Sequence, residues 1–201
     1  GQHNMNLTLV QEYLEQRSDY IVAGGTGLTD DYFGQAGPIS NSMTVQTSGG
    51  TVNGNSLISY IGRFNYNFAK KYFVQASLRR DGLSKLPYAN RWGTFPGISA
   101  GWTVSNENFM QGIKSTLSDL KLRASYAKVG NTDIGDYPYM SLYGNARYAN
   151  NTGLALARGG NPDLRWETSI KYDYGVDFGL FNNRITVNAD YFINDQNDII
   201  L

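Results

Sequence analysis

Two long runs of alternating apolar and polar residues meet at a short turn late in the sequence. From Ile170 to Leu180 the even positions are apolar, and from Ile185 to Ile193 the odd positions are apolar. A period of two over so many residues predicts two long β-strands, each with one apolar and one polar face. The residues between the runs, Asn182 and Asn183, suit a type I′ turn because Asn tolerates positive φ angles. This segment is therefore expected to be a β-hairpin with two unlike faces.

The same alternation recurs along most of the chain. It predicts strands at 3–13, 57–68, 72–80, 95–105, 119–130, 166–181 and 184–198. The connections at 69–71 and 182–183 are short and the one at 106–118 is of medium length, whereas those at 81–94 and 131–165 are long. In an up-and-down meander the two kinds would lie at opposite ends of the sheet, as they do in outer-membrane barrels. Residues 14–55, rich in Ser, Gly, Thr, Asn and Asp, are expected to form another long loop, with 20–22 and 43–45 as candidate short strands.

Composition narrows the functions open to such a sheet. The chain has 17 basic and 17 acidic residues, so bulk charge does not favour a nucleic-acid partner. It has no Cys and only one His, which excludes thiolate chemistry and most histidine-dependent catalysis. We expect no enzymatic activity, no cofactor and no metal site. No run approaches the ~18 apolar residues of a membrane helix, so a membrane role would have to use strands.

Strand length favours a transmembrane barrel over a soluble sandwich. Soluble strands usually have about 5–6 residues, while a strand that crosses a bilayer at a tilt needs ~9–11. Aromatic residues near strand ends are expected at the membrane interfaces: Tyr60, Phe68, Tyr72, Trp102, Phe178, Phe181 and Tyr191. Charged residues on the polar faces are expected to face a water-filled lumen: Arg63, Arg79, Arg123, Lys171, Asp173, Asp177 and Asp190. The alternative is a soluble β-sandwich that binds carbohydrate, whose outer surface would hydrate the same charges.

Six motifs, in order, resemble the barrel of SusC/RagA-type TonB-linked outer-membrane proteins. They are RDGLSK at 80–85, RWGTFPGISAGW at 91–102, ENFM at 107–110, LKLRASY at 120–126 followed by Gly130-Asn131, NPDLRWE at 161–167 and DFGLF at 177–181. Six motifs in one order are far more specific than any one of them. The family usually has Ser at Leu83 and Phe at Leu86, and both positions are expected to lie in a loop. The resemblance implies an antiparallel, up-and-down transmembrane β-barrel in the bacterial cell outer membrane.

For function, the resemblance implies energy-coupled import of large nutrients, which are oligosaccharides or, in some members, peptides. Residues 1–201 would form one partial barrel domain, with about seven to nine of roughly 22 strands. The plug domain, through which TonB acts, and the C-terminal strands would lie outside these residues. The loops at 14–55, 81–94 and 131–165 would be extracellular, beneath a SusD-like surface lipoprotein.

The loop at 131–165 is rich in flat rings and amide groups. Such groups stack on sugar rings and form hydrogen bonds with hydroxyls. The candidate substrate contacts are Tyr137, Tyr139, Tyr143, Asn145, Arg147 and Tyr148. The alternative is that these tyrosines pack the loop on itself or on the surface lipoprotein.

Overall fold

The computed structural model describes residues 2–26, 44–131, 133–148 and 151–198. The larger sheet contains β1 (His3–Thr26), β2 (Thr44–Phe68), β3 (Tyr72–Leu83), β4 (Trp92–Thr103), β5 (Leu117–Asn131), β8 (Glu167–Leu180) and β9 (Ile185–Asn197). A two-stranded sheet consists of β6 (Leu142–Tyr148) and β7 (Asn151–Arg158). Short 3-10 helices lie at η2 (Tyr88–Asn90), η3 (Val104–Asn106) and η4 (Asn108–Ile113). Within the described residues, no helix is long and apolar enough to cross a membrane.

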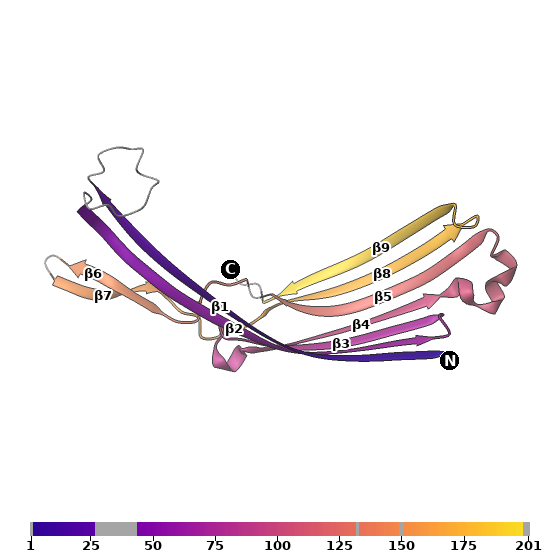
Figure 1. Ribbon diagram of the computed structural model, residues 1–201, viewed down its shortest axis with the longest axis horizontal. Coiled ribbons are helices and arrows are strands. Elements are labelled where there is room, and N and C mark those ends of the chain that lie inside the picture. The colour runs from indigo at the N-terminus through magenta and orange to yellow at the C-terminus, as the bar shows by residue number, and fades with distance from the viewer. Residues whose placement is uncertain (1, 27–43, 132, 149–150, 199–201) are drawn as a thin grey trace. The chain divides into compact units, whose positions relative to one another are not determined.

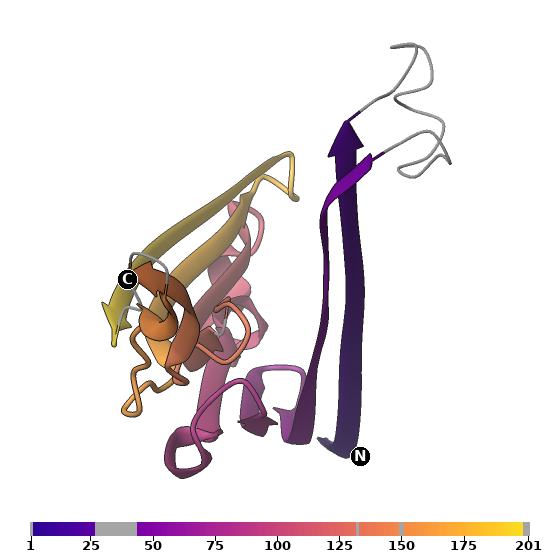
Figure 2. The ribbon, with the colours of Figure 1, turned by 90° about the vertical axis from the view of Figure 1, so that its left-hand side faces the viewer.

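The larger sheet is an antiparallel meander with the strand order β1-β2-β3-β4-β5-β8-β9 (Figure 1). Strands that follow one another in the chain pair with one another, except that the β6–β7 hairpin lies between β5 and β8 in sequence. The first and last strands of this order, β1 and β9, leave the described sheet with two open edges (Figure 2). The predicted up-and-down antiparallel topology is confirmed, and the sheet is not closed into a complete barrel.

Two of the predicted long loops contain strands. Strand β1 continues to Thr26 and β2 begins at Thr44, so the prediction of a loop over 14–55 was wrong for most of that range. Residues 15–56, the later part of β1 and the earlier part of β2, form a compact unit of their own. Side chains described in this unit are mostly exposed on both faces, so no period-two pattern marks its strands. The connection at 131–165 likewise contains the β6–β7 hairpin.

Two of the short turns have left-handed backbone at both central residues. Asn182 and Asn183 have φ angles of 59° and 62°, and the turn is closed by a hydrogen bond from Arg184 N to Phe181 O at 3.3 Å. Positive φ at both positions is the feature of a type I′ hairpin turn, as predicted. Ala69 and Lys70 have φ angles of 53° and 55° in the β2–β3 turn. Neither residue is an Asn or a Gly, so the sequence does not predict this conformation.

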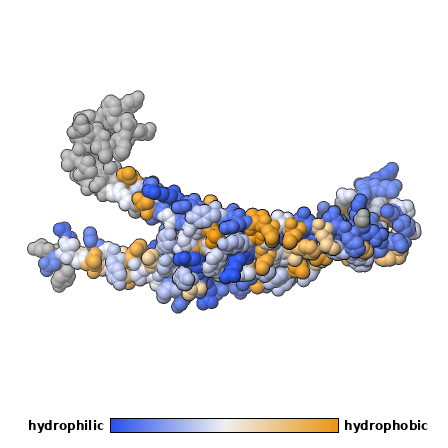
Figure 3. Space-filling model, turned by 60° about the horizontal axis from the view of Figure 1, so that its bottom comes forward, coloured by the Kyte–Doolittle hydropathy of each residue, from blue (hydrophilic) through white to orange (hydrophobic). Residues whose placement is uncertain are grey.

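The larger sheet is inverted relative to the sheets of soluble proteins. On its apolar face Leu78, Ile98 and Tyr174 are 53%, 54% and 51% exposed, whereas Gln75 and Ser99 on the opposite face are half-buried. Figure 3 shows hydrophobic residues gathered in a band along the sheet, between polar regions. A continuous apolar face of this kind is unfavourable in water and is satisfied by lipid. We refer to it as the apolar face and to its opposite as the polar face.

Aromatic side chains mark two levels of the apolar face. At the end near the β2–β3 turn, Phe68, Tyr72 and Trp102 stack in a row, with ring centroids 6.2 and 6.3 Å apart. At the other end Tyr60 stacks on Trp92 at 6.3 Å. Because Trp92 and Trp102 are ten residues apart on β4, they are separated by about 33 Å along the strand, or ~25 Å across a bilayer at the usual tilt. This separation matches the apolar band of a membrane barrel.

The other predicted interfacial residues are less uniform in position. Phe178 and Tyr191 lie on the apolar face, where Tyr191 is paired in register with Tyr174. Phe181 lies in the β8–β9 turn with a φ of 54°. Trp92, at the outer end of its strand, completes the level opposite Trp102.

Glu107 connects the strand ends at the level of Trp102. Its carboxylate accepts hydrogen bonds from Lys71 Nζ at 2.9 Å, Tyr72 Oη at 2.7 Å and Trp102 Nε1 at 3.2 Å. These bonds, that from the Lys71 ammonium foremost, hold the pKa of Glu107 below its usual range. The first residue of the ENFM motif therefore orients two interfacial rings and joins the β2–β3 turn to the end of β4.

A matched pair of substitutions on β4 tests the assignment of the two faces. We expect Ile98→Arg, near the middle of the apolar face, to reduce the free energy of unfolding in lipid vesicles by about 2–4 kcal/mol. Ser99→Arg, one residue further on the polar face, should cost no more than about 0.5 kcal/mol. Urea-induced unfolding of the whole protein in vesicles measures both, and equal costs would contradict the assignment.

Replacing Glu107 by Gln should make stability less dependent on acid pH. Because the folded-state pKa is lowered, the carboxylate contributes stability at a pH above its unfolded pKa of about 4.3, and loses it as the pH falls through the lower folded value. The urea midpoint of the wild type should therefore exceed that of Glu107→Gln at pH 7, and the two should converge in acid. A difference that is constant with pH would show that the carboxylate charge is not responsible.

Candidate functional site

The charged residues that alternate with the apolar positions lie together on the polar face. Strand register places all seven predicted lumen-facing residues there: Arg63, Arg79, Arg123, Lys171, Asp173, Asp177 and Asp190. The sequence pattern therefore identified their common face. Their exposure to a lumen stays a prediction, which the inverted burial of the sheet favours.

Arg123 joins three strands through two carboxylates. Its guanidinium binds Asp177 on β8 through two bonds of 2.8 and 2.9 Å, and Asp190 on β9 through one of 2.8 Å. Gly175 lies between Arg123 and Asp190 in register, and its missing side chain lets the guanidinium cross β8. A Cβ at Gly175 would lie 2.5 Å from Asp190 Oδ1 and 2.7 Å from Arg123 Cζ. Because the groups are partly exposed, each ion pair contributes little to stability.

Arg79 forms a second network near the other end of the polar face. Its Nε donates to both carboxylate oxygens of Asp81 at 2.8 and 2.7 Å, and its Nη2 donates to Ser59 Oγ at 3.0 Å. Glu12 on β1 accepts a further bond at 3.3 Å. Asp81 and Ser59 are buried, and a buried carboxylate is tolerated because it is paired. This network joins β1, β2 and β3.

A row of hydrogen-bonding side chains crosses the polar face between the two networks. Strand register aligns Asn65, Gln75, Ser99, Ser125 and Asp173 across five adjacent strands. They line a hollow of about 500 Å³. At the usual strand spacing the row is about 19 Å long. No side-chain hydrogen bond within the described ranges occupies these five groups, so they are available to a polar ligand or to another part of the protein.

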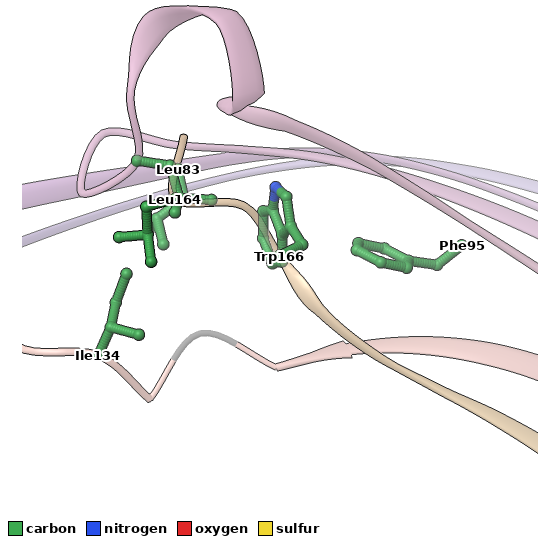
Figure 4. Close-up of a cluster of buried hydrophobic side chains, with 6 residues drawn as sticks. Leu83, Phe95, Ile134, Leu164 and Trp166 are labelled. Carbon is green, nitrogen blue, oxygen red and sulfur yellow. The ribbon is translucent and has the colours of Figure 1, made fainter. Parts of the chain in front are cut away.

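The connections at one end of the sheet are packed into a small hydrophobic core (Figure 4). Its buried members are Leu83, Leu86, Phe95, Ile134, Leu164 and Trp166, with Leu57 and Tyr139 packed against them. Trp166 lies between Leu164 and Phe95, in edge contact with the Phe95 ring at 5.2 Å (Figure 4). Its indole Nε1 donates to Arg91 O at 3.1 Å. We refer to this cluster as the loop core.

Polar residues within and beside the six motifs connect the loops that form this core. Asn161 Oδ1 accepts a bond from Asp163 N at 3.0 Å, which forms the turn of the NPDLRWE motif. Asn90 Nδ2 donates to Leu164 O at 3.1 Å, and Lys85 forms an ion pair of 3.4 Å with Asp136. The long β3–β4 and β5–β8 connections are therefore packed on each other.

Sequence reasoning did not predict the loop core. Leu83 and Leu86 were expected in a loop, and both are buried, Leu86 completely. Leu83 is the last residue of β3, while Leu86 lies in the loop as expected. The signal that could have found the core is the presence of apolar residues within otherwise polar connections.

The six predicted substrate contacts fall into two groups. The rings of Tyr137 and Tyr139 meet edge-on, with their centroids 6.2 Å apart, and Tyr139 packs against the loop core. Tyr143, Asn145 and Arg147 alternate along β6 and share one exposed face of the β6–β7 hairpin. The side chain of the sixth, Tyr148, lies outside the described residues. The structure therefore brings together three of the predicted contacts on the hairpin and two beside the core.

A metal centre has no basis in the described ranges, where no group of three or more His, Asp or Glu side chains is placed to hold an ion.

Comparison with known proteins places these features in a family context. The family model described as TonB dependent receptor-like, beta-barrel matches residues 2–201. The chain is 38% identical over 157 residues to TonB-dependent receptor P39 of Formosa agariphila, covering 78% of this chain and 15% of the relative. It is also 38% identical over 158 residues to TonB-dependent receptor SusC of Bacteroides thetaiotaomicron, covering 73% of this chain and 15% of that protein.

A solved structure agrees with these sequence relatives. The structure of the RagAB peptide transporter matches with a TM-score of 0.84 and 31% identity, over 100% of this chain and 22% of that chain. The chain thus spans roughly a fifth or less of the length of these relatives.

Two glycines in one row of the polar face provide a matched test of the Arg123 network. Gly175→Ala should displace the guanidinium and cost about 0.5–1 kcal/mol in the free energy of unfolding. Gly101→Ala is the control, because the nearest atoms to its added Cβ lie at 3.6 Å, an ordinary contact. Urea unfolding of both variants in the wild-type and Arg123→Met backgrounds measures the coupling. A cost for Gly175→Ala that persists without Arg123 would contradict this explanation.

Proposed function

Because the chain belongs to the family of TonB-dependent receptor β-barrels, we propose that it forms part of the wall of an outer-membrane importer of large nutrients. The observation that carries this proposal is the inverted sheet, whose apolar face suits lipid and whose polar face suits an aqueous interior. Barrels of this family lie in the bacterial outer membrane. The family consists of receptors rather than enzymes, and the alternative of a soluble carbohydrate-binding sandwich has no support.

The transported substrate is proposed to be an oligosaccharide or a peptide. One relative bears the name SusC, and the solved structure that matches is that of the RagAB peptide transporter. We further propose that a SusD-like surface lipoprotein covers the receptor. Energy would reach it from the TonB complex through a plug region outside these 201 residues.

The orientation proposed for the sheet follows from the lengths of its connections. The short turns at 69–71 and 181–184 would face the periplasm, and the loop core with the β6–β7 hairpin would face outside. The three residues that share one face of the hairpin, Tyr143, Asn145 and Arg147, would contact substrate as it enters. The uncharged row from Asn65 to Ser125 would then offer hydrogen bonds along the lumen.

Uptake by cells that express the complete receptor tests the proposal. Labelled oligosaccharides and peptides are supplied separately, with and without a protonophore, to the wild type and to a Tyr143→Ala, Arg147→Ala double variant. We expect one substrate class to accumulate only with proton-motive force, and its apparent affinity to fall about tenfold in the double variant because ring and charged contacts are lost.

The control is Ala155→Ser on the opposite face of the hairpin, which should take up substrate as the wild type does. Energy-independent uptake, or none of either class, would reject the import proposal. Unchanged affinity in the double variant would reject only the role of the hairpin.

A further inference from the structure

An apolar groove crosses the lipid-facing side of β1, β2 and β3. Leu9 and Leu78 form its walls, and Gly62 between them forms its floor. The groove has a volume of about 610 Å³, within the range of sites that bind small ligands. It exists because position 62 has no side chain, and a Cβ there would meet only Leu9 Cδ2, at 3.6 Å. A larger residue would therefore fill the groove without disturbing the backbone.

The cationic side chain of Arg80 lies at one end of this groove, near Trp92. The guanidinium carbon of Arg80 lies 5.2 Å from the centre of the Trp92 ring, and its neighbours in register, Tyr60 and Thr94, are neutral. In the part of the chain that the structure describes, no carboxylate pairs with Arg80. A guanidinium that lies over the face of an aromatic ring does not engage its N–H donors in that contact, so they can bind a phosphate through two bonds. Gln11 adds an amide at the border of the groove.

We propose that this groove binds lipid A, a phosphorylated glycolipid of the outer leaflet. An acyl chain of the lipid would lie over Gly62 and one of its phosphates would bind Arg80. An apolar channel that ends at an unpaired cation matches a ligand with an apolar chain and an anionic head. Charged residues within the membrane region are costly unless they are paired, and a lipid phosphate supplies the missing anion. The choice of lipid A rests on the orientation proposed above, which places the Trp92 level in the outer leaflet.

A second hollow on the apolar face lacks a free cation and provides a comparison for the role of Arg80 in binding a headgroup. It has a volume of about 350 Å³ and is lined by Val74, Ala100 and Trp102. The charged residue at its border, Arg123, is engaged by Asp177 and Asp190 on the polar face. This hollow has the apolar surface without a free cation, so it should accept acyl chains without selecting a headgroup.

Lipid binding to the complete, purified receptor tests the site by native mass spectrometry. The probes are bisphosphorylated lipid A, dephosphorylated lipid A and phosphatidylglycerol. We expect the wild type to prefer bisphosphorylated lipid A, and Arg80→Gln to weaken its binding about tenfold. Gly62→Val should weaken all lipid A forms by filling the groove, whereas Ala100→Val, in the second hollow, is the control and should bind as the wild type does. Valine suits a strand, so folding should be preserved.

Equal lipid A binding by the wild type, Arg80→Gln and Gly62→Val would overturn the proposal, as would equal binding of the dephosphorylated form. Preference for phosphatidylglycerol would reject lipid A as the ligand. Substrate uptake by the same receptors separates this result from the proposed function. Normal uptake without selective lipid A binding rejects the lipid site alone, and selective binding without uptake rejects import alone.

Discussion

The structure depends on backbone hydrogen bonding within a sheet whose one face is suited to lipid. Without water on that face, each N–H and C=O must be paired with a neighbouring strand, and a meander of long antiparallel strands meets this requirement between its edges. The β2–β3 ladder alone pairs every residue from Leu57 to Phe68 with one on β3. Register is then strongly specified, because a slip of one residue would move the polar side chains of a strand to the apolar face, where a basic residue costs about 2–4 kcal/mol at the bilayer centre.

The same register builds the polar face. Because cross-strand partners point the same way, the alternating polar positions of five strands become a continuous row from Asn65 to Asp173. The networks around Arg79 and Arg123 each join three strands on that face. Gly175 contributes by lacking a side chain, because the Arg123 guanidinium occupies the space that a Cβ at this position would need.

The two ends of the sheet are completed in different ways. Near the short turns, the Glu107 carboxylate holds Lys71, Tyr72 and Trp102, so a single acidic residue organises the interfacial ring row. At the opposite end, long connections pack around Trp166 and leave the β6–β7 hairpin exposed. Charge and hydrogen bonding determine one end, and a hydrophobic core determines the other.

The sequence by itself determined the period-two strands from residue 57 onward, the left-handed turn at Asn182-Asn183 and the common face of the charged residues, because alternation and turn propensity are local properties. It did not reveal the long strands within 14–55, since a ladder with water on both faces requires no apolar alternation. Only the tertiary structure decided that Leu86 and Trp166 share a core, that Gly175 admits the Arg123 guanidinium, and that Gly62 opens a groove beside Arg80. Each of these depends on which residues meet across strands and loops, and that is a property of register and packing rather than of any single segment.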